Sequence, residues 1–158
     1  MTVPDPDPVV VRLVPGDEAI AHRTFAVMAE VFETDHEPLS DTYVADLLAS
    51  GAFWAFAALR DGEVIGGLTA HTLPMTVGER SEVFLYDLAV RPEWQRRGVG
   101  RRLVRSLRDQ AAAAGVDLVF VPADDDDAHA LDFYRSLGGR AAKVTIFEFG
   151  RPTPGATS

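Results

Sequence analysis

Cysteine is absent from this chain of 158 residues, and lysine occurs once, as Lys143. Without cysteine there is no disulfide scaffold, no thiolate nucleophile and no zinc or iron–sulfur site held by thiolates. No apolar run approaches the ~20 residues that a membrane-spanning helix needs. The first eight residues carry acids and prolines where a signal peptide would carry basic charge followed by an apolar stretch. We therefore expect a cytoplasmic protein.

Charge is plentiful but unevenly distributed along the chain. There are 24 acidic and 15 basic residues, for a net charge of −9. Seven of the basic residues are arginines between Arg91 and Arg108, a segment that holds one acid, Glu93. A globally acidic protein repels nucleic acid and anionic membranes, so neither is expected as a partner. The basic segment could bind a polyanion while the acidic remainder attracts a cation, although a solvated helix face would give the same distribution.

Length and composition predict one soluble domain, expected at residues 9–150 between a flexible N-terminal segment, 1–8, and a flexible tail, 151–158. The order of the strands and helices that apolar periodicity and turn residues predict indicates the α/β class, with a mixed central sheet flanked by helices. The expected strands are 9–13, 53–59, 63–73, 81–90, 118–121 and 141–149. The expected helices are 17–31, 40–48, 98–114 and 127–137.

Several local signals sharpen this outline. The residues expected to cap helices with their side chains are Asp17, Ser40 and Asp127. The pair Asp61-Gly62 predicts a tight hairpin between two strands. Helix 40–48 is expected to bury Tyr43, Leu47 and Leu48. Helix 98–114 is expected to bury Val99, Leu103, Val104, Leu107 and Ala111, and to expose Arg102, Arg105 and Arg108 to solvent.

The most informative segment joins strand 81–90 to helix 98–114 through a loop with two glycines, Gly98 and Gly100. The unpaired N–H groups of a first helical turn and the helix dipole both favour an anion. Glycine lets the backbone approach such a ligand closely, and neighbouring arginines add positive charge. The segment is neither a Walker loop nor a dinucleotide-binding fingerprint. From the residues alone, a tight strand-to-helix turn without a ligand is an equal alternative.

The segment Gln95-Arg-Arg-Gly-Val-Gly100 resembles the Q/R-x-x-G-x-G/A acyl-CoA loop of the GNAT N-acetyltransferase superfamily. About thirty residues later, Ala130-Leu-Asp-Phe-Tyr-Arg-Ser-Leu-Gly138 resembles the A-x-x-F/L-Y-x-x-x-G helix of the same superfamily. The likeness extends over residues 9–149. It implies a single-domain GNAT fold, whose central strands splay apart, and acetyl-CoA as co-substrate.

A narrower resemblance connects the chain with aminoglycoside 3-N-acetyltransferases of the gentamicin/fortimicin class, type I. It runs through Leu73-Pro74, Arg80 to Val90 and Val121 to Asp125. The chain departs from that class at Trp94 and in the acidic run before His129. The resemblance implies an antibiotic-inactivating acetyltransferase that transfers acetyl directly to a cationic amine, and a possible homodimer. Two alternatives stay open: a GNAT enzyme acting on a polyamine, an amino acid or a protein N-terminus, and a non-catalytic acyl-CoA-binding domain.

The resemblance also assigns residues to acetyl-CoA. The strand end would pair with the pantetheine amides through Leu88, Ala89 and Val90. The pyrophosphate would be held by the loop and first helical turn, Gln95, Arg96, Arg97, Gly98, Val99, Gly100 and Arg101. The histidines, including His36, His71 and His129, show no metal-ligand spacing, so no metal is expected.

Amine acetylation needs a proton acceptor, because an alkylamine has a pKa of ~10.4 and reacts only when unprotonated. The candidates are Asp87, preferred because it lies nearest the acyl-CoA loop, and Glu82. Strict strand alternation would point them to opposite faces, and a β-bulge would bring both to one face. The resemblance assigns the general acid for the departing thiolate to Tyr134. An acidic rim for the acceptor is expected from Asp35, Glu37, Asp124, Asp125 and Asp126, although the aspartate run would also serve as a solvated helix cap.

Overall fold

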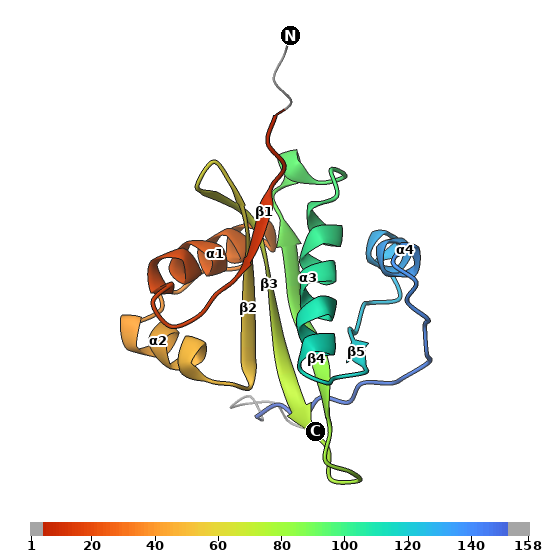
Figure 1. Cartoon of the computed structure of the whole chain (residues 1–158). Coiled ribbons are helices and arrows are strands. Elements are labelled where there is room, and N and C mark those ends of the chain that lie inside the picture. Colours follow the sequence, from red (N-terminus) through yellow and green to blue (C-terminus); the bar gives the residue numbers. More distant parts are fainter. Residues whose placement is uncertain (1–4, 152–158) are drawn as a thin grey trace. The chain divides into compact units, whose positions relative to one another are not determined.

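The protein is described by a computed structural model for residues 5–151, and the chain divides into two compact units, Met1–Pro122 and Ala123–Ser158. Figure 1 shows the elements in chain order. The strands are β1 (Val9–Arg12), β2 (Phe53–Arg60), β3 (Glu63–Pro74), β4 (Ser81–Val90) and β5 (Val119–Phe120). The helices are α1 (Glu18–Val31), α2 (Asp41–Ala49), the 3₁₀ turn η1 (Pro92–Trp94), α3 (Val99–Ala113) and α4 (Ala128–Ser136).

The first unit is built on a five-stranded mixed sheet in the order β1-β2-β3-β4-β5. Strands β1 to β4 pair with one another in antiparallel fashion, and β5 runs parallel to β4. The β2–β3 hairpin turns at Asp61 and Gly62, which both have positive φ, at 48° and 79°. Two successive positive φ values match the right-handed twist of a hairpin, so the Asp-Gly prediction is confirmed.

Helices cover both faces of this sheet, with α1 and α2 on one side and α3 on the other (Figure 1). Ala55 and Ala57 of β2 pack with Ala21 of α1 and Val44 of α2 in one buried cluster. The intervening Trp54 lies on the opposite face, because successive strand residues alternate between faces. We call these two surfaces the α1 face and the α3 face.

Helix α1 approaches β3 closely at Gly67. A Cβ atom at this position would lie 2.5 Å from Cγ2 of Thr24 and 2.9 Å from Sδ of Met28. No side chain fits there without moving the helix, so the missing side chain of Gly67 sets the distance between α1 and the sheet. Thr24, fully buried, donates a hydrogen bond from Oγ1 to the carbonyl of Ile20, 2.8 Å away.

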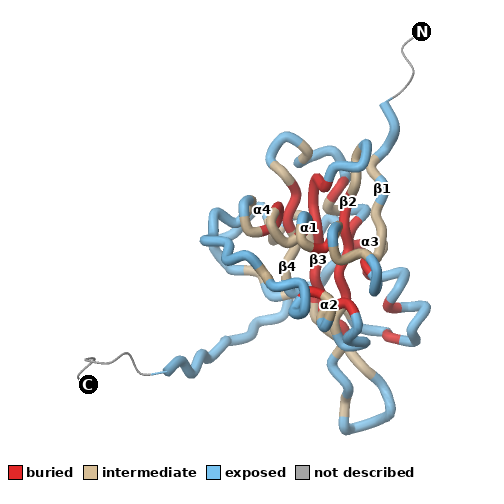
Figure 2. Tube along the Cα trace, turned by 90° about the vertical axis from the view of Figure 1, so that its left-hand side faces the viewer, coloured by how far each residue is buried: buried red, intermediate tan, exposed pale blue. Residues whose placement is uncertain are grey.

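Helix α3 buries the face that its sequence predicts. Its five buried residues are Val99, Leu103, Val104, Leu107 and Ala111. The arginines at positions 102, 105 and 108 are exposed, also as predicted. The helix is bounded by two glycines of positive φ, Gly98 at 79° and Gly115 at 75°. Figure 2 shows how the buried residues concentrate on the central strands.

Two predicted caps form and one does not. Ser40 accepts a hydrogen bond from the Tyr43 amide at 3.1 Å, and Asp127 accepts one from the Ala130 amide at 3.0 Å. Asp17 precedes α1 but turns back, and its carboxylate accepts from the Val14 amide at 2.9 Å. In α2 the prediction that Tyr43 is buried is wrong. Its side chain is 53% exposed, because Val44 and Leu48, one turn apart, face the core instead.

The expectation of a final strand at 141–149 is also wrong. Residues 141–150 are irregular, and the apolar side chains among them are exposed, up to 96% for Phe149. β-branched and aromatic residues favour a strand, but a strand forms only where a partner supplies the ladder. None of the described residues pairs with this segment in a sheet, and Figure 2 draws it in the colour of exposed residues.

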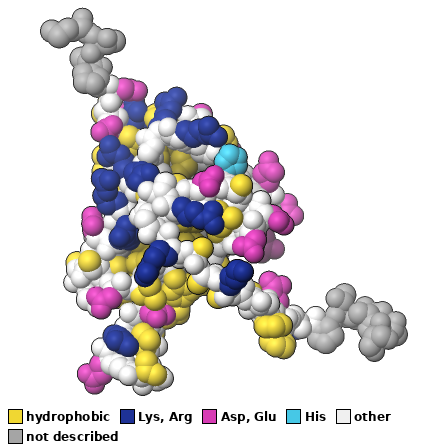
Figure 3. Space-filling view, turned by 90° about the vertical axis from the view of Figure 1, so that its right-hand side faces the viewer, with side chains coloured by type: hydrophobic (Ala, Val, Ile, Leu, Met, Phe, Trp, Pro, Cys, Tyr) yellow, Lys and Arg dark blue, Asp and Glu magenta, His cyan; other side chains and the backbone are white. Residues whose placement is uncertain are grey.

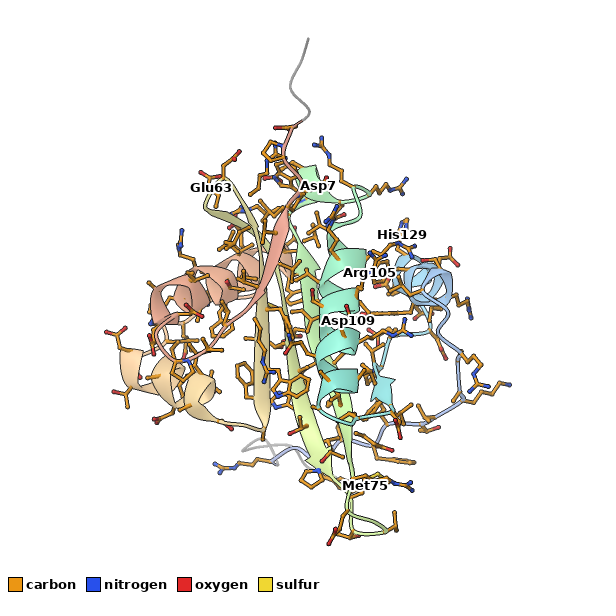
Figure 4. All side chains as sticks on the ribbon, viewed as in Figure 1. Asp7, Glu63, Met75, Arg105, Asp109 and His129 are labelled. Atoms are coloured by element: carbon orange, nitrogen blue, oxygen red, sulfur yellow. The ribbon has the colours of Figure 1, made fainter. Side chains whose placement is uncertain are left out.

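The expected flexible ends lie partly outside the described residues, namely at 1–4 and 152–158. Within residues 5–8 the chain is held to the first unit by two ion pairs. Asp5 pairs with Arg60, and Asp7 pairs with Arg102 at 2.8 Å. The label of Asp7 in Figure 4 lies near the start of β1. The flexibility of both ends stays a prediction.

Candidate active site

The candidate site begins at an irregularity in β4. Thr69 of β3 pairs with Asp87, whereas the next residue, Ala70, pairs with Leu85, so Tyr86 is an extra residue without a partner on β3. This is a β-bulge of the kind that would bring the two candidate carboxylates, Glu82 and Asp87, to the same face of the sheet. Leu73 pairs with Glu82 and Thr69 with Asp87, and these two β3 residues share a face because their positions differ by four, an even number. Glu82 and Asp87 therefore both lie on the α1 face.

The two carboxylates are nevertheless well separated. Their partners on β3 are four residues apart, which corresponds to ~13 Å along a strand at ~3.3 Å per residue. One amino group cannot touch both. If both contact one acceptor molecule, they contact different amino groups of it.

Asp87 is half-buried, and its surroundings alter its acidity. Burial raises the pKa of Asp87, and the nearby charge of His71 lowers it by a smaller amount. A carboxylate of raised pKa is a stronger base than a solvent-exposed one. The role of Asp87 as general base stays a prediction.

His71 belongs to a row of aromatic side chains that the sequence patterns do not reveal. On the α1 face, His71 lies 5.5 Å from Phe53 and 5.4 Å from Tyr86, measured between ring centroids. Tyr86 lies 5.5 Å from Phe84, which stacks on Phe120 at 5.1 Å. We call these five residues the aromatic row. They come from four strands, so only the Phe84–Tyr86 spacing is visible in the sequence.

The pairing of β4 with β5 covers only two positions, Val83 with Val119 and Phe84 with Phe120. From the bulge onward β4 has β3 on one side, while on the other side it has separated from β5. The central strands of the described sheet thus splay at Asp87. The predicted pantetheine-binding residues Leu88, Ala89 and Val90 follow directly on the splayed part of β4.

Residues 95–101, which we call the glycine loop, lead from β4 into α3. Arg96 and Gly98 both adopt positive φ, at 60° and 79°, so the backbone turns sharply twice within three residues. A Cβ atom on Gly98 would meet no heavy atom within 4 Å, so glycine is required there by backbone conformation and not by crowding. The first-turn amides of α3 lack intrahelical acceptors by the geometry of a helix, which suits an anion.

Two side chains brace this loop. Gln95 donates from Nε2 to the Val90 carbonyl at 2.9 Å, which ties the start of the loop to the end of β4. Trp94 contacts two guanidinium groups, those of Arg60 at 4.9 Å and Arg97 at 5.0 Å from its ring centroid. Gln95, predicted as an acetyl-CoA contact, thus has a clear supporting role in the loop itself.

Arginines make this end of the first unit basic. Figure 3 shows many dark-blue Lys and Arg side chains on the face that it views. Arg102 is paired with Asp7, whereas Arg105 is exposed on the outer side of α3 (Figure 4). A pocket of about 440 Å³ lies elsewhere in the unit, lined among others by Trp54, Met75 and Gly115. Asp87 is not among its lining residues, so we do not assign it to the reaction.

Comparison with known proteins agrees with this arrangement of a splayed strand, a glycine loop and a helix N-terminus. The model of the acetyltransferase (GNAT) family matches residues 21–138, a range that includes parts of both compact units. The chain belongs to the GNAT acetyltransferase family. Its fold is accordingly the GNAT fold, a single domain with a five-stranded mixed sheet.

Solved structures of two aminoglycoside acetyltransferases from uncultured soil metagenomic samples resemble this GNAT chain over nearly all of its length. One, in complex with sisomicin, is 29% identical, with a TM-score of 0.86, and the match covers 92% of this chain and 97% of that one. The other is 34% identical, with a TM-score of 0.86, and the match covers 93% and 100%.

Among curated proteins, the [ribosomal protein bS18]-alanine N-acetyltransferase of Salmonella typhimurium is 36% identical over 63 residues, 40% of this chain and 43% of that protein. Mycothiol acetyltransferase of Kytococcus sedentarius is 32% identical over 140 residues, 86% of this chain and 45% of that protein. The matches thus cover less than half the length of these curated relatives.

The remaining predicted site residue of the GNAT motifs, Tyr134, lies on α4 in the second unit. Its ring is half-buried and lies 5.1 Å from that of Phe133. Burial raises the pKa of the Tyr134 phenol, and the negative charge of Asp127 raises it further. The phenol therefore keeps its proton throughout the neutral range, as a proton donor must. Gly138, the last residue of the motif, has a φ of 89° just after the helix end.

The predicted acidic rim of this GNAT chain is divided between the two units. Asp35 and Glu37 are exposed in the connection between α1 and α2. Asp124, Asp125 and Asp126 are exposed ahead of α4, where the Asp124 carbonyl accepts a hydrogen bond from the Asp127 amide at 3.0 Å. Their part in acceptor binding stays a prediction.

Within residues 5–151, no group of three or more His, Asp or Glu side chains is arranged to hold a metal ion. In the same range, no helix has the length and apolar character needed to span a bilayer.

Proposed function

We propose that this protein transfers the acetyl group of acetyl-CoA to an amino group of an aminoglycoside. The observation that carries the proposal is the position of Asp87. This half-buried carboxylate lies on the splayed part of β4, a few residues before the glycine loop. It does so in a chain 34% identical, over 93% of its length, to an aminoglycoside acetyltransferase.

The glycine loop fits the phosphates of acetyl-CoA. Its two positive-φ residues, Arg96 and Gly98, turn the chain into the N-terminus of α3, where backbone amides and the helix dipole favour an anion. Arg96, Arg97 and Arg101 add positive charge to the same segment. The backbone of Leu88 to Val90 beside the splay would bind the pantetheine amides as an added strand would.

In the proposed reaction the acceptor amine gives a proton to Asp87, directly or through water, and its lone pair attacks the thioester carbonyl. The nitrogen of the tetrahedral intermediate then loses its extra proton to solvent, and the intermediate collapses with cleavage of the C–S bond, so that the amide forms and CoA leaves as a thiolate. We assign protonation of that thiolate to Tyr134, on the likeness of its helix to the GNAT motif. The proposed steps are proton transfers and acyl transfer between these groups.

The 3-amino group is the proposed site of acetylation, on the resemblance to type I aminoglycoside 3-N-acetyltransferases. Antibiotic resistance, a cytoplasmic location and a homodimer belong to the same proposal. An acidic protein with a basic loop suits the two ligands, since one is a polycation and the other carries phosphates.

A second acceptor class is favoured by one observation, the 36% identity to a ribosomal-protein-alanine N-acetyltransferase over 63 residues. The acceptor would then be the α-amino group of a protein that begins with alanine. That match covers 40% of this chain, against 93% for the second aminoglycoside acetyltransferase described above, so we place it second.

The deciding experiment measures release of CoA thiol from acetyl-CoA with sisomicin, gentamicin, kanamycin, spermidine and an alanine-initiated peptide as separate acceptors. We expect turnover on sisomicin and gentamicin, with a product acetylated at the 3-amine by NMR. Turnover on the peptide alone would replace the aminoglycoside with a protein N-terminus. Tight acetyl-CoA binding without turnover on any acceptor would contradict both.

A further inference from the structure

We propose that the ring of Tyr86 is the acceptor-contacting side chain that makes the site selective for rigid, cyclic polyamines over flexible, linear ones. The inference rests on the proposed function and deepens it. Its starting point is the bulge in β4, where Tyr86 has no partner residue on β3 and its side chain is 59% exposed.

Exposure of this kind is unusual for a tyrosine that lies on a sheet between other rings. Tyr86 is held on both sides, by His71 at 5.4 Å and by Phe84 at 5.5 Å, in edge-to-face contacts with interplanar angles of 83° and 77°. Such contacts favour this orientation of the ring. A ring that is restrained before binding loses less conformational entropy when a ligand binds against it.

The exposed ring lies between two carboxylates on the same face of the sheet. Asp87 is its direct neighbour in the chain, and Glu82 lies toward the other end of the α1 face, ~13 Å from Asp87 along the strand. Phe84 and Phe120 continue the apolar surface between and beside them. An apolar surface with a carboxylate at each end is complementary to a cyclic molecule that carries several amino groups.

Chemistry favours a cyclic polyamine over a linear one on this surface. A saturated ring presents a face of C–H groups that can lie flat on an aromatic ring, and an ammonium group attached to it is attracted by the π electrons. A flexible chain such as spermidine makes the same charge contacts with Asp87 and Glu82. It makes less contact with the aromatic surface and loses more conformational entropy on binding. The carboxylates thus select for positive charge, and Tyr86 selects for rings.

Binding rather than turnover tests this directly. Isothermal titration calorimetry would measure the affinity of sisomicin for the protein saturated with CoA. Because CoA carries no acetyl group, sisomicin is not acetylated during the titration. We expect Tyr86→Ala and Tyr86→Leu each to raise the Kd of sisomicin about tenfold, and Tyr86→Phe to change it less than about twofold. The Kd of spermidine should rise less than about threefold in Tyr86→Ala and in Tyr86→Leu. Tyr43→Ala, which removes another exposed tyrosine from the surface, is the matched control and should leave both affinities unchanged.

Acetyl-CoA affinity, measured on the same variants, reports whether each is folded, and the leucine variant keeps apolar bulk if the alanine variant does not fold. Unchanged sisomicin affinity in folded Tyr86→Ala or Tyr86→Leu would overturn the inference, as would an equal loss for spermidine or no sisomicin binding by the unaltered protein. The proposed function is judged separately by acetyl transfer. Sisomicin that binds with the expected dependence on Tyr86 but is not acetylated would end the proposed function and leave this inference standing.

Discussion

The glycine loop and the aromatic row both involve β4 but are built in different ways. The loop follows the end of the strand at Val90, whereas Phe84 and Tyr86 of the row lie within it. The loop is a backbone structure, defined by the positive φ values of Arg96 and Gly98 and by the free amide ends of a helix. The row is a side-chain structure, assembled from β2, β3, β4 and β5 around a half-buried carboxylate. The loop suits the phosphates of CoA, which all acyl-CoA molecules share. The row suits the acceptor, which differs from one acetyltransferase to another.

This difference has a functional consequence. Substitutions in the loop should act on acetyl-CoA binding through backbone conformation, whereas substitutions around Asp87 should act on the acceptor and on proton transfer through side-chain chemistry. Kinetic constants for the two substrates can therefore be used to test whether the two regions are as separate as their construction indicates.

The largest effect is expected at Asp87. Asp87→Asn keeps the shape of the side chain but cannot accept a proton at neutral pH, so we expect kcat to fall by about 10²–10⁴-fold. The KM for acetyl-CoA should stay within about twofold, because Asp87 belongs to the acceptor side. Steady-state kinetics with both substrates varied would measure this. Asp109→Asn, a loss of the same charge on the exposed side of α3, is the control (Figure 4). A wild-type kcat in Asp87→Asn would remove this residue from the mechanism.

Tyr134→Phe should have the next largest effect, a fall in kcat of about 10- to 100-fold with both KM values retained. The phenol supplies a proton to the departing thiolate, and phenylalanine keeps the ring contact with Phe133 while removing the hydroxyl. Acetyl-CoA analogues with a more acidic thiol need less help, so the loss should shrink with them. A kcat equal to that of the unaltered protein would show that Tyr134 is a packing residue of the second unit only.

Gly98→Val addresses the loop. A β-branched residue at a φ of 79° is strained by about 1–2 kcal/mol or more, so the loop should distort and the KM for acetyl-CoA should rise about tenfold. Gly115→Val is a matched control at the other end of α3, because its φ is 75° and its Cβ would also meet open space. Both variants should lose similar stability in thermal unfolding, but only Gly98→Val should weaken acetyl-CoA binding. An equal rise in KM for both would mean that helix stability alone explains the loss.

The contrast between the two regions also explains what can be predicted from the sequence. The glycine loop is encoded locally, within seven residues, and the predictions of its Gly98 turn and of the buried face of α3 are both confirmed. The bulge that brings Glu82 and Asp87 to one face is expected from the resemblance to the superfamily, since strand alternation alone predicts opposite faces. The aromatic row escapes prediction, because His71 meets Phe84 only through the β3–β4 register, and no local pattern gives that register.

The errors have the same origin. The helical pattern that predicts a buried Tyr43 fits two adjacent faces of α2, and only the packing of Val44 against α1 and the sheet decides between them. Residues 141–149 have strand-forming side chains, but a strand also needs a partner, and strand propensity carries no information about one. The positions of Glu82 and Asp87 on one face follow from geometry, whereas their roles rest on chemistry that only kinetics can measure.

A smaller effect is expected in the pH dependence of stability. Because burial raises the pKa of Asp87 in the folded protein, folding is opposed by the charge of this group at any pH above that raised pKa. The opposition disappears below the unfolded value of ~3.9, where the group is protonated in both states. Asp87→Asn should therefore raise the melting temperature at pH 7.5, and the difference should shrink as the pH falls toward 4. A variant that melts below the unaltered protein at pH 7.5 would show that the Asp87 charge is stabilising.

The smallest effect is expected at Arg105, and it is the most direct test of the loop as a backbone structure. Arg105 is exposed on α3, two turns beyond Gly98 (Figure 4). If the loop binds phosphate through its backbone amides, it does not need this side chain. We expect Arg105→Ala to change the KM for acetyl-CoA by less than about twofold at physiological salt, where exposed charges more than ~8 Å away are largely screened. Arg97→Ala, which removes a guanidinium held against Trp94 inside the loop, should change it more. If Arg105→Ala weakened acetyl-CoA as much as Gly98→Val, the binding of phosphate would depend on the summed positive charge of α3. The difference in construction between the glycine loop and the aromatic row would then not extend to function.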